Sequence, residues 1–190
     1  MTPPSRAGRL ALLITSLAVA DSAAAAAAAT AATAATADAR PQVGDVAPPI
    51  PLDAKAAPPA PAGAVTVVDF FATWCRPCHR ALRDLALIRD SLGPRVRIVL
   101  VDVGEDPAAV RRFLADAPPP NGAEVAFDPS GATARRWGQD RFPTTFLVDE
   151  AGVIRHINRG WGPHYRDRIS RWLRAMLPGD DEPRRAPRAP

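Results

Sequence analysis

One stretch of this chain, VTVVDFFATWCRPC at residues 65–78, carries the clearest structural signal of its 190 residues. The apolar first half is typical of a buried β-strand, and the stretch ends in the chain's only two cysteines, Cys75 and Cys78. Apolar residues then recur at helical spacing from Ala81 to Leu92. Cys75 is therefore expected at the N-terminus of a helix, where the helix dipole and free N–H groups favour the thiolate that attacks disulfides. The pattern predicts a dithiol redox site.

A structural disulfide is the alternative interpretation of these two cysteines. A bridge between Cys75 and Cys78 closes so short a loop that it constrains little of the entropy of the unfolded chain. The redox interpretation is therefore preferred.

Two segments resemble the thioredoxin superfamily. Residues 68–78 resemble its active-site segment, and FPTTFLVD at residues 142–149 resembles its cis-proline segment, followed by a hairpin strand. The likeness extends over residues 43–177, and within the superfamily the chain is most similar to the exported TlpA/ResA-type thiol-disulfide oxidoreductases. The resemblance implies an α/β thioredoxin fold, a mixed central β-sheet flanked by helices, here with an N-terminal extension.

The remaining periodicities are compatible with this fold. Beyond the first strand and helix, strands are expected at residues 95–103, 144–148 and 153–158, and helices after Asp106 and around Ala132. A last helix is expected to bury Tyr165, Ile169, Trp172, Leu173 and Met176. The expected order is β-α-β-α-β-β-α, with no internal repeat and no second domain.

Composition divides the chain into four segments. Residues 1–20 resemble a secretory signal peptide, with a basic start, an apolar run and a small-x-small cleavage pattern. Residues 21–40 form an Ala/Thr-rich low-complexity spacer, residues 41–177 the thioredoxin-like domain, and residues 178–190 a disordered Pro/Arg-rich tail. The protein is expected to be exported, to the periplasm or another extracytoplasmic space; a membrane anchor formed by an uncleaved signal is the alternative.

The two cysteines are expected to have different roles. Cys75 is the better exposed sulfur in this geometry and is expected to attack, whereas Cys78, one turn inside the helix, is expected to resolve the mixed disulfide. No cofactor is expected beyond this redox-active disulfide, and no metal site is predicted.

Asp69 lies six residues before Cys75. The resemblance implies that it matches the buried aspartate of cytosolic thioredoxins, which relays a proton to and from the inner cysteine. Burial among apolar neighbours raises the pKa of a carboxyl group, which suits proton transfer near neutral pH. A hydrogen-bonded polar residue at a strand end is the alternative.

Three residues are expected to contact the substrate. The resemblance implies a cis peptide bond before Pro143 and a carbonyl of Phe142 that pairs with the substrate backbone; a rigid surface turn is the alternative. Trp74 is expected to lie over the disulfide, with ordinary packing as the alternative.

The start of the helix is expected to tune the site. Arg76 and Pro77 separate the cysteines, and His79 follows them. The basic residues Arg76, His79, Arg80 and Arg83 should lower the pKa of the attacking cysteine and make the pair more oxidising. The Arg76-Pro77 dipeptide is expected to tune the same balance. Most superfamily members have a helix-kinking proline at the position of Arg83, so a straighter helix is expected here.

Residues 75–79, CRPCH, also match the attachment motif of c-type haem, C-x-x-C-H. Met176, His156 and His164 are candidate distal ligands. Haem attachment does not explain the preceding strand, Trp74 or the later cis-proline segment, so it is the minor alternative.

The function predicted from these features is a cell-envelope thiol-disulfide oxidoreductase that reduces disulfides of client proteins, including in cytochrome c maturation. A disulfide-forming oxidase is the main alternative. Expected partners are client proteins with disulfides or thiols and a membrane protein that donates electrons by thiol transfer. The net charge is only +4, and no basic patch interleaved with aromatic residues occurs, so no nucleic-acid partner is expected.

Overall fold

A computed structural model describes residues 40–52 and 63–177. The predicted signal peptide, almost all of the predicted spacer and the predicted C-terminal tail lie outside these residues. Within the described ranges, no helix is long and apolar enough to cross a membrane.

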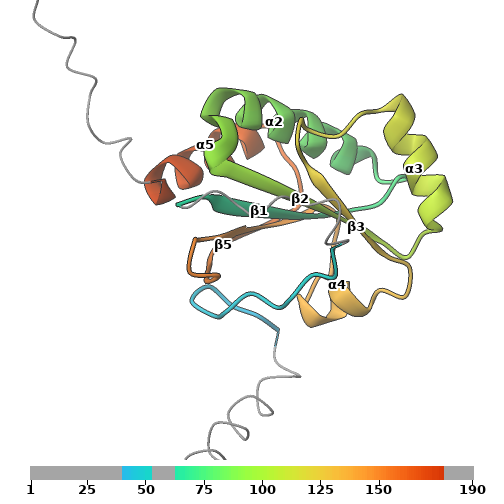
Figure 1. Cartoon of the computed structure of the whole chain (residues 1–190), viewed down its shortest axis with the longest axis horizontal. Helices are drawn as coiled ribbons and strands as arrows, with labels where there is room; N and C mark the ends of the chain where they lie inside the picture. Colours follow the sequence, from blue (N-terminus) through green and yellow to red (C-terminus); the bar gives the residue numbers. More distant parts are fainter. Residues whose placement is uncertain (1–39, 53–62, 178–190) are drawn as a thin grey trace, which may run out of the picture. The chain divides into compact units, whose positions relative to one another are not determined.

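The centre of the fold is a mixed five-stranded sheet with the strand order β3-β2-β1-β4-β5 (Figure 1). The strands are β1 (Val65–Phe71), β2 (Val96–Val103), β3 (Glu124–Asp128), β4 (Thr144–Val148) and β5 (Ile154–Arg159). β2 runs parallel to both β1 and β3, whereas β4 is antiparallel to β1 and β5. β1 is thus the central strand, which explains its almost unbroken burial and its apolar sequence.

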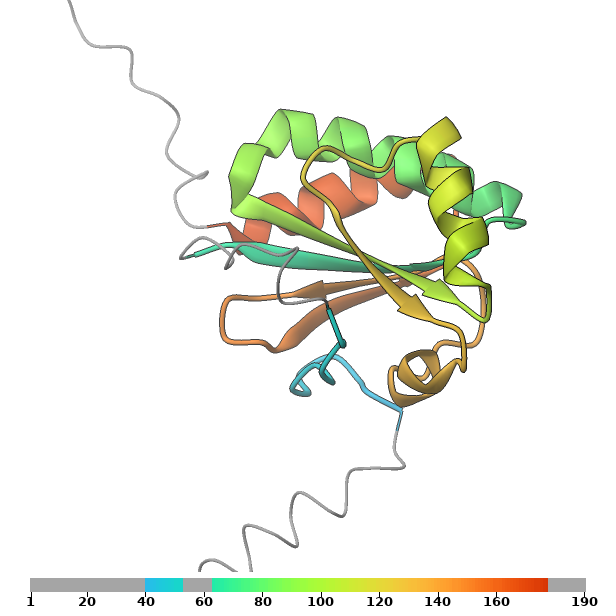
Figure 2. The ribbon, with the colours of Figure 1, turned by 45° about the vertical axis from the view of Figure 1, so that its right-hand side comes forward.

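Helices cover both faces of the sheet (Figures 1 and 2). They are α2 (Arg76–Leu92), the short 3-10 helix η1 (Gly93–Arg95), α3 (Pro107–Asp116), α4 (Ala132–Arg136) and α5 (Tyr165–Met176). α2, α3 and α5 lie over one face, and α4 lies over the other. The thioredoxin-like α/β architecture expected from the sequence is therefore confirmed.

Each face of β1 supports its own hydrophobic core. The core on the α2 side contains Leu85 of α2 and Ile169 of α5. The other core contains Phe70, Phe146 and Trp137, whose rings are packed with centroids 4.8–5.8 Å apart. Truncating a fully buried aromatic residue such as Trp137 to alanine costs about 3–5 kcal/mol. The packing on both faces therefore fixes β1, and with it the turn at its end.

The sequence-based element order is wrong at one point, because it omits β3. This strand is short, begins with the half-buried Glu124 and lies at the edge of the sheet, so its apolar signal is weak. α3 connects β2 to β3 as a parallel crossover. Two side chains of the last helix, Trp172 and Met176, are only half-buried rather than buried.

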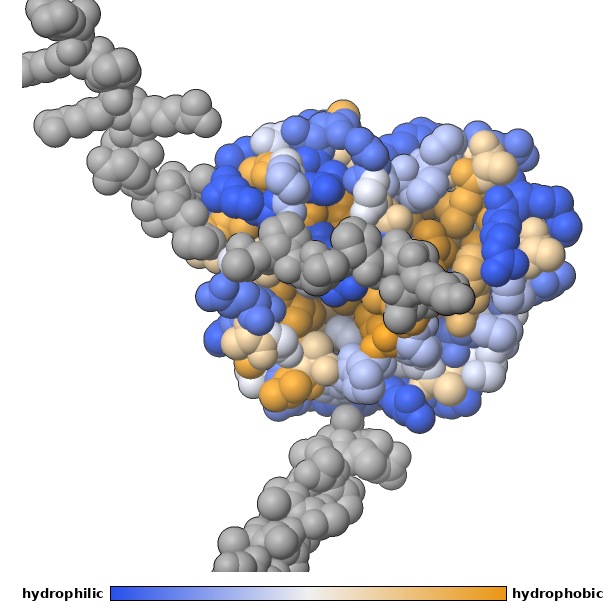
Figure 3. Space-filling model, in the orientation of Figure 1, coloured by the Kyte–Doolittle hydropathy of each residue, from blue (hydrophilic) through white to orange (hydrophobic). Residues whose placement is uncertain are grey.

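A pocket of about 600 Å³ lies on the α4 side of the sheet, and neither cysteine lines it. It is bounded by residues of the 47–52 segment, by Thr66 and Val68 of β1, and by the turn at 149–152. On the face shown in Figure 3, apolar surface lies toward the middle and hydrophilic residues surround it. Because neither cysteine lines it, the pocket lies apart from the end of β1 that leads into the cysteines.

Candidate active site

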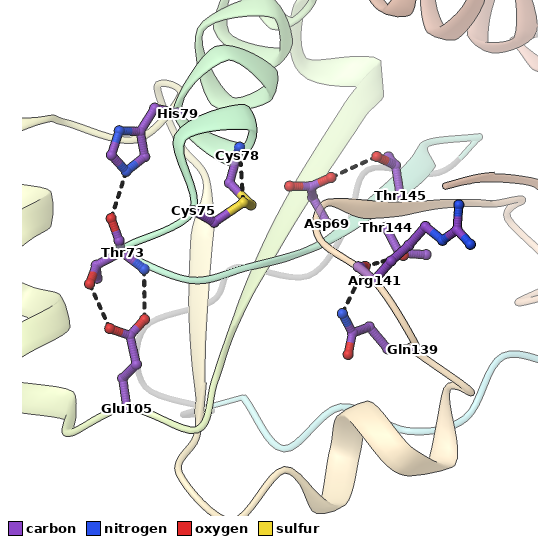
Figure 4. Close-up of a disulfide and its surroundings, with 10 residues drawn as sticks. All are labelled: Asp69, Thr73, Cys75, Cys78, His79, Glu105, Gln139, Arg141, Thr144 and Thr145. Carbon is purple, nitrogen blue, oxygen red and sulfur yellow. Dashed lines mark hydrogen bonds between the residues drawn. A yellow bond between two sulfur atoms is a disulfide. The ribbon is translucent and has the colours of Figure 1, made fainter. Parts of the chain in front are cut away.

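The two cysteines form a disulfide at the N-terminus of α2 (Figure 4). Their Cα atoms are 5.2 Å apart. Cys75 is the N-cap residue, and its Sγ accepts a hydrogen bond of 3.2 Å from the backbone N–H of Cys78. Cys75 is 4% exposed and Cys78 is 0% exposed. Cys75 is therefore the more exposed of the two residues, although only a small part of it reaches solvent.

Asp69 lies on β1 and is fully buried. Its Oδ1 accepts a hydrogen bond of 2.6 Å from the hydroxyl of Thr145, the residue opposite it in the β1–β4 pairing. Its Oδ2 is buried and has no hydrogen-bond partner among the described residues. Figure 4 shows the carboxyl group between Thr145 and the disulfide, with the unbonded oxygen on the side of the cysteines.

The environment of Asp69 changes its acidity. Burial raises the pKa of Asp69 to about 7, and the hydrogen bond from Thr145 limits the increase. This value allows the group to gain and lose a proton near neutral pH. The structure thus gives Asp69 the burial expected from the sequence, but adds a partner, Thr145, that the sequence analysis did not identify.

The hydroxyl of Thr145 also contacts a second buried side chain. The Oη atom of Tyr165, at the start of α5, lies 2.9 Å from Thr145 Oγ1. Tyr165 is fully buried, and the sequence analysis assigned it only to the core. Its contact with Thr145 depends on the docking of α5 against the face of the sheet that α2 also covers, which no local sequence pattern reports.

The Phe142–Pro143 peptide bond is cis, as expected. Hydrogen bonds fix the surrounding loop: the Thr144 hydroxyl donates to the carbonyl of Arg141 at 2.7 Å, and the N–H of Gly160 donates to the carbonyl of Pro143 at 2.7 Å. The loop is therefore held from two sides.

Trp74 connects the cysteine turn with this loop. Its ring packs edge-to-face against Phe142, with centroids 5.4 Å apart, and its side chain is 66% exposed. Trp74 and Phe142, two of the expected substrate-contact residues, therefore lie together beside the disulfide.

A cluster of three carboxyl groups, those of Glu105, Asp102 and Asp128, lies next to the turn before the cysteines. Glu105 accepts two hydrogen bonds from Thr73, one from its N–H at 2.6 Å and one from its hydroxyl at 2.5 Å (Figure 4). The carbonyl of Thr73 lies 2.7 Å from Nε2 of His79, whose ring packs against Phe113. His79, in the first turn of α2, is therefore partly buried and contacts the turn before the cysteines.

Asp102, near the end of β2, completes this cluster. The residue is fully buried, and neither of its carboxyl oxygens has a hydrogen-bond donor among the described residues. Burial first, and then the adjacent carboxyl groups of Glu105 and Asp128, raise the pKa of Asp102 to about 8. Burial also disfavours the charge on Glu105, but the two hydrogen bonds from Thr73 outweigh it and lower the pKa of Glu105.

This cluster of carboxyl groups was not predicted from the sequence. Its signal was an acidic residue inside the apolar run of residues 96–103, followed three residues later by Glu105. Asp69 also lies inside an apolar strand, but it was identified through its position six residues before Cys75 and the family resemblance, and Asp102 has no such match.

The basic residues around the cysteines lie partly in solvent. Arg76 and Pro77 are exposed at the start of α2. The guanidinium of Arg80 lies 4.9 Å from the centre of the Trp161 ring, and the Trp161 indole N–H donates to Asp84 at 2.8 Å. No group of three or more potential metal ligands occurs within the residues that the structure describes.

Comparisons with known proteins agree with this geometry. The sequence profile of the Redoxin family matches residues 42–169. The chain belongs to the Redoxin family. The match contains every element that surrounds the disulfide, from β1 to the first part of α5.

Similar Redoxin-family proteins carry names that describe disulfide chemistry. The chain is 34% identical over 96 residues to a thiol:disulfide interchange protein DsbE homolog of Paracoccus denitrificans, covering 50% of this chain and 51% of that protein. It is 30% identical to the thiol:disulfide interchange protein HelX of Rhodobacter capsulatus, covering 62% of this chain and 63% of that protein. The chain thus matches about half to three fifths of the length of these relatives.

A solved structure is also similar. The crystal structure of a thiol:disulfide interchange protein DsbE from Chlorobium tepidum superposes with a TM-score of 0.64 and 27% sequence identity, covering 72% of this chain and 99% of that one. This Redoxin-family chain therefore has the thioredoxin-like fold. The expected similarity to TlpA/ResA-type proteins is confirmed by 28% identity over 115 residues to the thiol-disulfide oxidoreductase ResA of Bacillus cereus, covering 58% of this chain and 62% of that protein.

Proposed function

We propose that this chain is a thiol-disulfide oxidoreductase that reduces disulfides of client proteins. The observation that carries the proposal is the arrangement around the cysteine pair: Cys75 caps α2, the Phe142–Pro143 loop packs against the adjacent Trp74, and the Asp69 carboxyl lies beside the disulfide. The names of the similar proteins support the same class of reaction.

The reaction starts from the reduced dithiol. The thiolate of Cys75 attacks one sulfur of a client disulfide, forms a mixed disulfide and releases the other client sulfur. Cys78 gives its proton to the Asp69 carboxylate and attacks Cys75 Sγ, and the bond between Cys75 and the client sulfur breaks. The two released client thiolates take up protons from solvent, so the client leaves as a dithiol, and Asp69 later returns its proton to solvent. Two electrons pass from the chain to the client, and the chain ends in the disulfide form that the structure shows.

The remaining residues of the site bind the client and adjust the cysteines. Trp74 and the Phe142–Pro143 loop form the proposed contact surface, and the Phe142 carbonyl is the proposed backbone partner. Arg76, Pro77 and His79 set the stability of the Cys75 thiolate.

The cell envelope is the proposed location, with residues 1–20 as the export signal and an uncleaved signal as an alternative anchor. A membrane protein that transfers electrons through thiols is the proposed source of reducing equivalents, because each catalytic cycle leaves the cysteine pair oxidised. Apocytochromes c are a proposed client class on the basis of the TlpA/ResA resemblance.

A disulfide-forming oxidase is the second candidate, and the exposed basic start of α2 favours it. Arg76 and Arg80 stabilise the reduced thiolate, which makes a cysteine pair more oxidising. Haem attachment is less well supported, because Nε2 of its axial ligand, His79, already contacts the Thr73 carbonyl at 2.7 Å.

The reduction potential of the Cys75–Cys78 pair distinguishes the two redox candidates. The protein is equilibrated in glutathione buffers and followed by tryptophan fluorescence, with Trp74→Phe assigning the signal. A reductase is expected near or below about −250 mV, whereas a value near about −120 mV would reassign the protein as an oxidant.

Covalent capture of clients gives an independent test. A Cys78→Ser variant keeps the attacking sulfur but lacks the resolving one, so it should accumulate mixed disulfides with oxidised clients through Cys75. The matched Cys75→Ser variant should accumulate none. Equal capture by both variants would contradict the proposed division of roles.

A further inference from the structure

Three fully buried polar side chains form a continuous hydrogen-bonded row, whose Asp69 end lies beside the disulfide in Figure 4. Asp69 comes from β1, Thr145 from β4 and Tyr165 from α5. The distances are 2.6 Å from Thr145 Oγ1 to Asp69 Oδ1 and 2.9 Å from Thr145 Oγ1 to Tyr165 Oη. Buried polar groups need such partners, but the proposed exchange reaction assigns no task to Thr145 or Tyr165.

The chemistry of the groups determines the direction of both hydrogen bonds. An ionised carboxylate only accepts, so the single hydroxyl proton of Thr145 points to Asp69. Thr145 then has no proton left for Tyr165, and Tyr165 must donate to Thr145. The row therefore runs from Tyr165 through Thr145 to Asp69.

This direction makes the two oxygens of Asp69 unequal. Oδ1 is occupied by the Thr145 hydroxyl, whereas Oδ2 has no partner among the described residues and lies on the cysteine side of the group in Figure 4. A proton bound to Asp69 is therefore favoured on Oδ2, where it faces the cysteine pair.

We propose that Tyr165 and Thr145 are positioning residues for dithiol exchange, which hold Oδ1 of Asp69 and reserve Oδ2 for the proton that Cys78 gives up. This inference rests on the proposed function, because it assigns the proton transfer of that reaction to one atom. Tyr165 acts only through Thr145, since the hydroxyl of Thr145 lies between Tyr165 and Asp69.

The charges around the row keep Tyr165 a donor. Burial first, and then the charge of Asp69, raise the pKa of Tyr165 well above its usual value; Asp84 of α2 acts in the same direction, and Arg168 of α5 opposes it. At Asp69 itself, Thr145 of β4 contacts the carboxyl group and the cysteines at the start of α2 lie beside it in Figure 4, whereas Tyr165 of α5 contacts Thr145. Tyr165 remains protonated through the pH range in which Asp69 titrates.

The test is a double-mutant cycle on the acid dissociation of Asp69. The oxidised full chain is titrated by carbon NMR of its aspartate carboxyl groups, with Asp69→Asn assigning the resonance. The disulfide form is used because its cysteines do not titrate. Thr145→Val should make Asp69 about tenfold less acidic, since it removes a hydrogen bond to the charged form. Tyr165→Phe should act in the same direction, by about two- to threefold.

The double variant Thr145→Val, Tyr165→Phe tests whether Tyr165 acts on Asp69 through Thr145. Because Tyr165 acts through Thr145, adding Tyr165→Phe to Thr145→Val should produce no further change in the acidity of Asp69. Independent, additive effects, or no effect of Tyr165→Phe alone, would overturn the proposal. Thr144→Val is the matched control: it removes a neighbouring hydroxyl that bonds to Arg141 and should leave Asp69 unchanged.

Two further measurements keep a negative result interpretable. Thr145→Ser retains the hydroxyl and should restore the wild-type titration, which separates loss of the hydrogen bond from loss of folding. In the reduced protein, the pH profile of disulfide exchange should move with the acidity of Asp69 in each variant. Since the NMR titration requires no exchange activity, an inactive wild type with an intact cycle would contradict the proposed function alone.

Discussion

Asp69 on β1 and Asp102 on β2 are the same residue type, lie on adjacent central strands and are both fully buried, but they have different neighbours. Asp69 has a hydroxyl partner, Thr145, which stabilises its charged form. Asp102 has the carboxyl groups of Glu105 and Asp128, which disfavour its charge. Burial raises both pKa values, to about 7 for Asp69 and about 8 for Asp102.

The comparison shows that the neighbour determines what a buried acid can do. Asp69 has a free oxygen on the side of the disulfide and titrates near neutral pH, which suits proton exchange with Cys78. Asp102 keeps its proton to higher pH and lies behind Glu105, which holds the turn at Thr73. Asp69 is therefore suited to proton transfer, whereas Asp102 is suited to a structural role next to the turn.

The largest expected effect is on the pH dependence of stability. Both acids have raised pKa values in the folded protein, so the stability that they contribute is present below about pH 4 and is lost as the pH rises through the folded-state values. For Asp69 the shift from 3.8 to about 7 corresponds to a loss of about 4 kcal/mol. Asp69→Asn should remove this loss, measured by denaturant unfolding of the oxidised protein from pH 4 to pH 8.

The same experiment separates the two acids. In Asp69→Asn, stability should still decline up to about pH 8, through Asp102. Adding Asp102→Asn should flatten the remaining slope. A single substitution that flattens the whole profile would show that the two sites are not independent.

The next effect is on the reaction. Asp69→Asn should slow the release of the mixed disulfide at neutral pH by about a hundredfold, because a positioned acid-base group contributes at least that factor. Asp102→Asn should change the rate by less than about threefold, since Asp102 reaches the cysteines only through Glu105 and Thr73. Both rates are measured by stopped-flow mixing of the reduced protein with a disulfide peptide, followed by tryptophan fluorescence. Comparable losses in the two variants would contradict the assignment of Asp69 as the proton acceptor.

The smallest effect is expected at the support of the turn. Glu105→Ala removes two hydrogen bonds to Thr73 and should cost about 2 kcal/mol of unfolding free energy. It should also make Asp102 more acidic, because a neighbouring carboxylate is lost. Glu105→Gln, which keeps the shape without the charge, should recover part of the stability. Denaturant unfolding at pH 7 measures both variants, and an unchanged Glu105→Ala would show that Glu105 does not hold the turn.

The elements next to the cysteines could be predicted because their signals are local. The apolar run of β1, the spacing of buried residues along α2 and the cis-proline segment each appear in a few consecutive residues. β3 was missed because a short edge strand needs little apolar sequence. The burial of Asp69 followed from its own strand.

The partners of the site residues could not be predicted in the same way. Thr145 meets Asp69 through the register of β1 and β4, and Tyr165 reaches Thr145 through the docking of a helix twenty residues later. Glu105 meets Thr73 across 32 residues of chain. Such contacts depend on tertiary structure, and the sequence supplies only the residue types.

The sulfur of Cys75 is also the acceptor that caps α2. The atom that changes its oxidation state therefore takes part in the hydrogen bonding of the helix, and a thiolate accepts more strongly than a sulfur in a disulfide. The backbone amide of Cys78 should consequently exchange its hydrogen with solvent more slowly in the reduced protein than in the oxidised one. The exchange rate of this one amide therefore indicates whether the cysteine pair is reduced or oxidised. The hydrogen bond that caps α2, beside the proposed client-binding surface, should accordingly be stronger in the reduced protein than in the oxidised one.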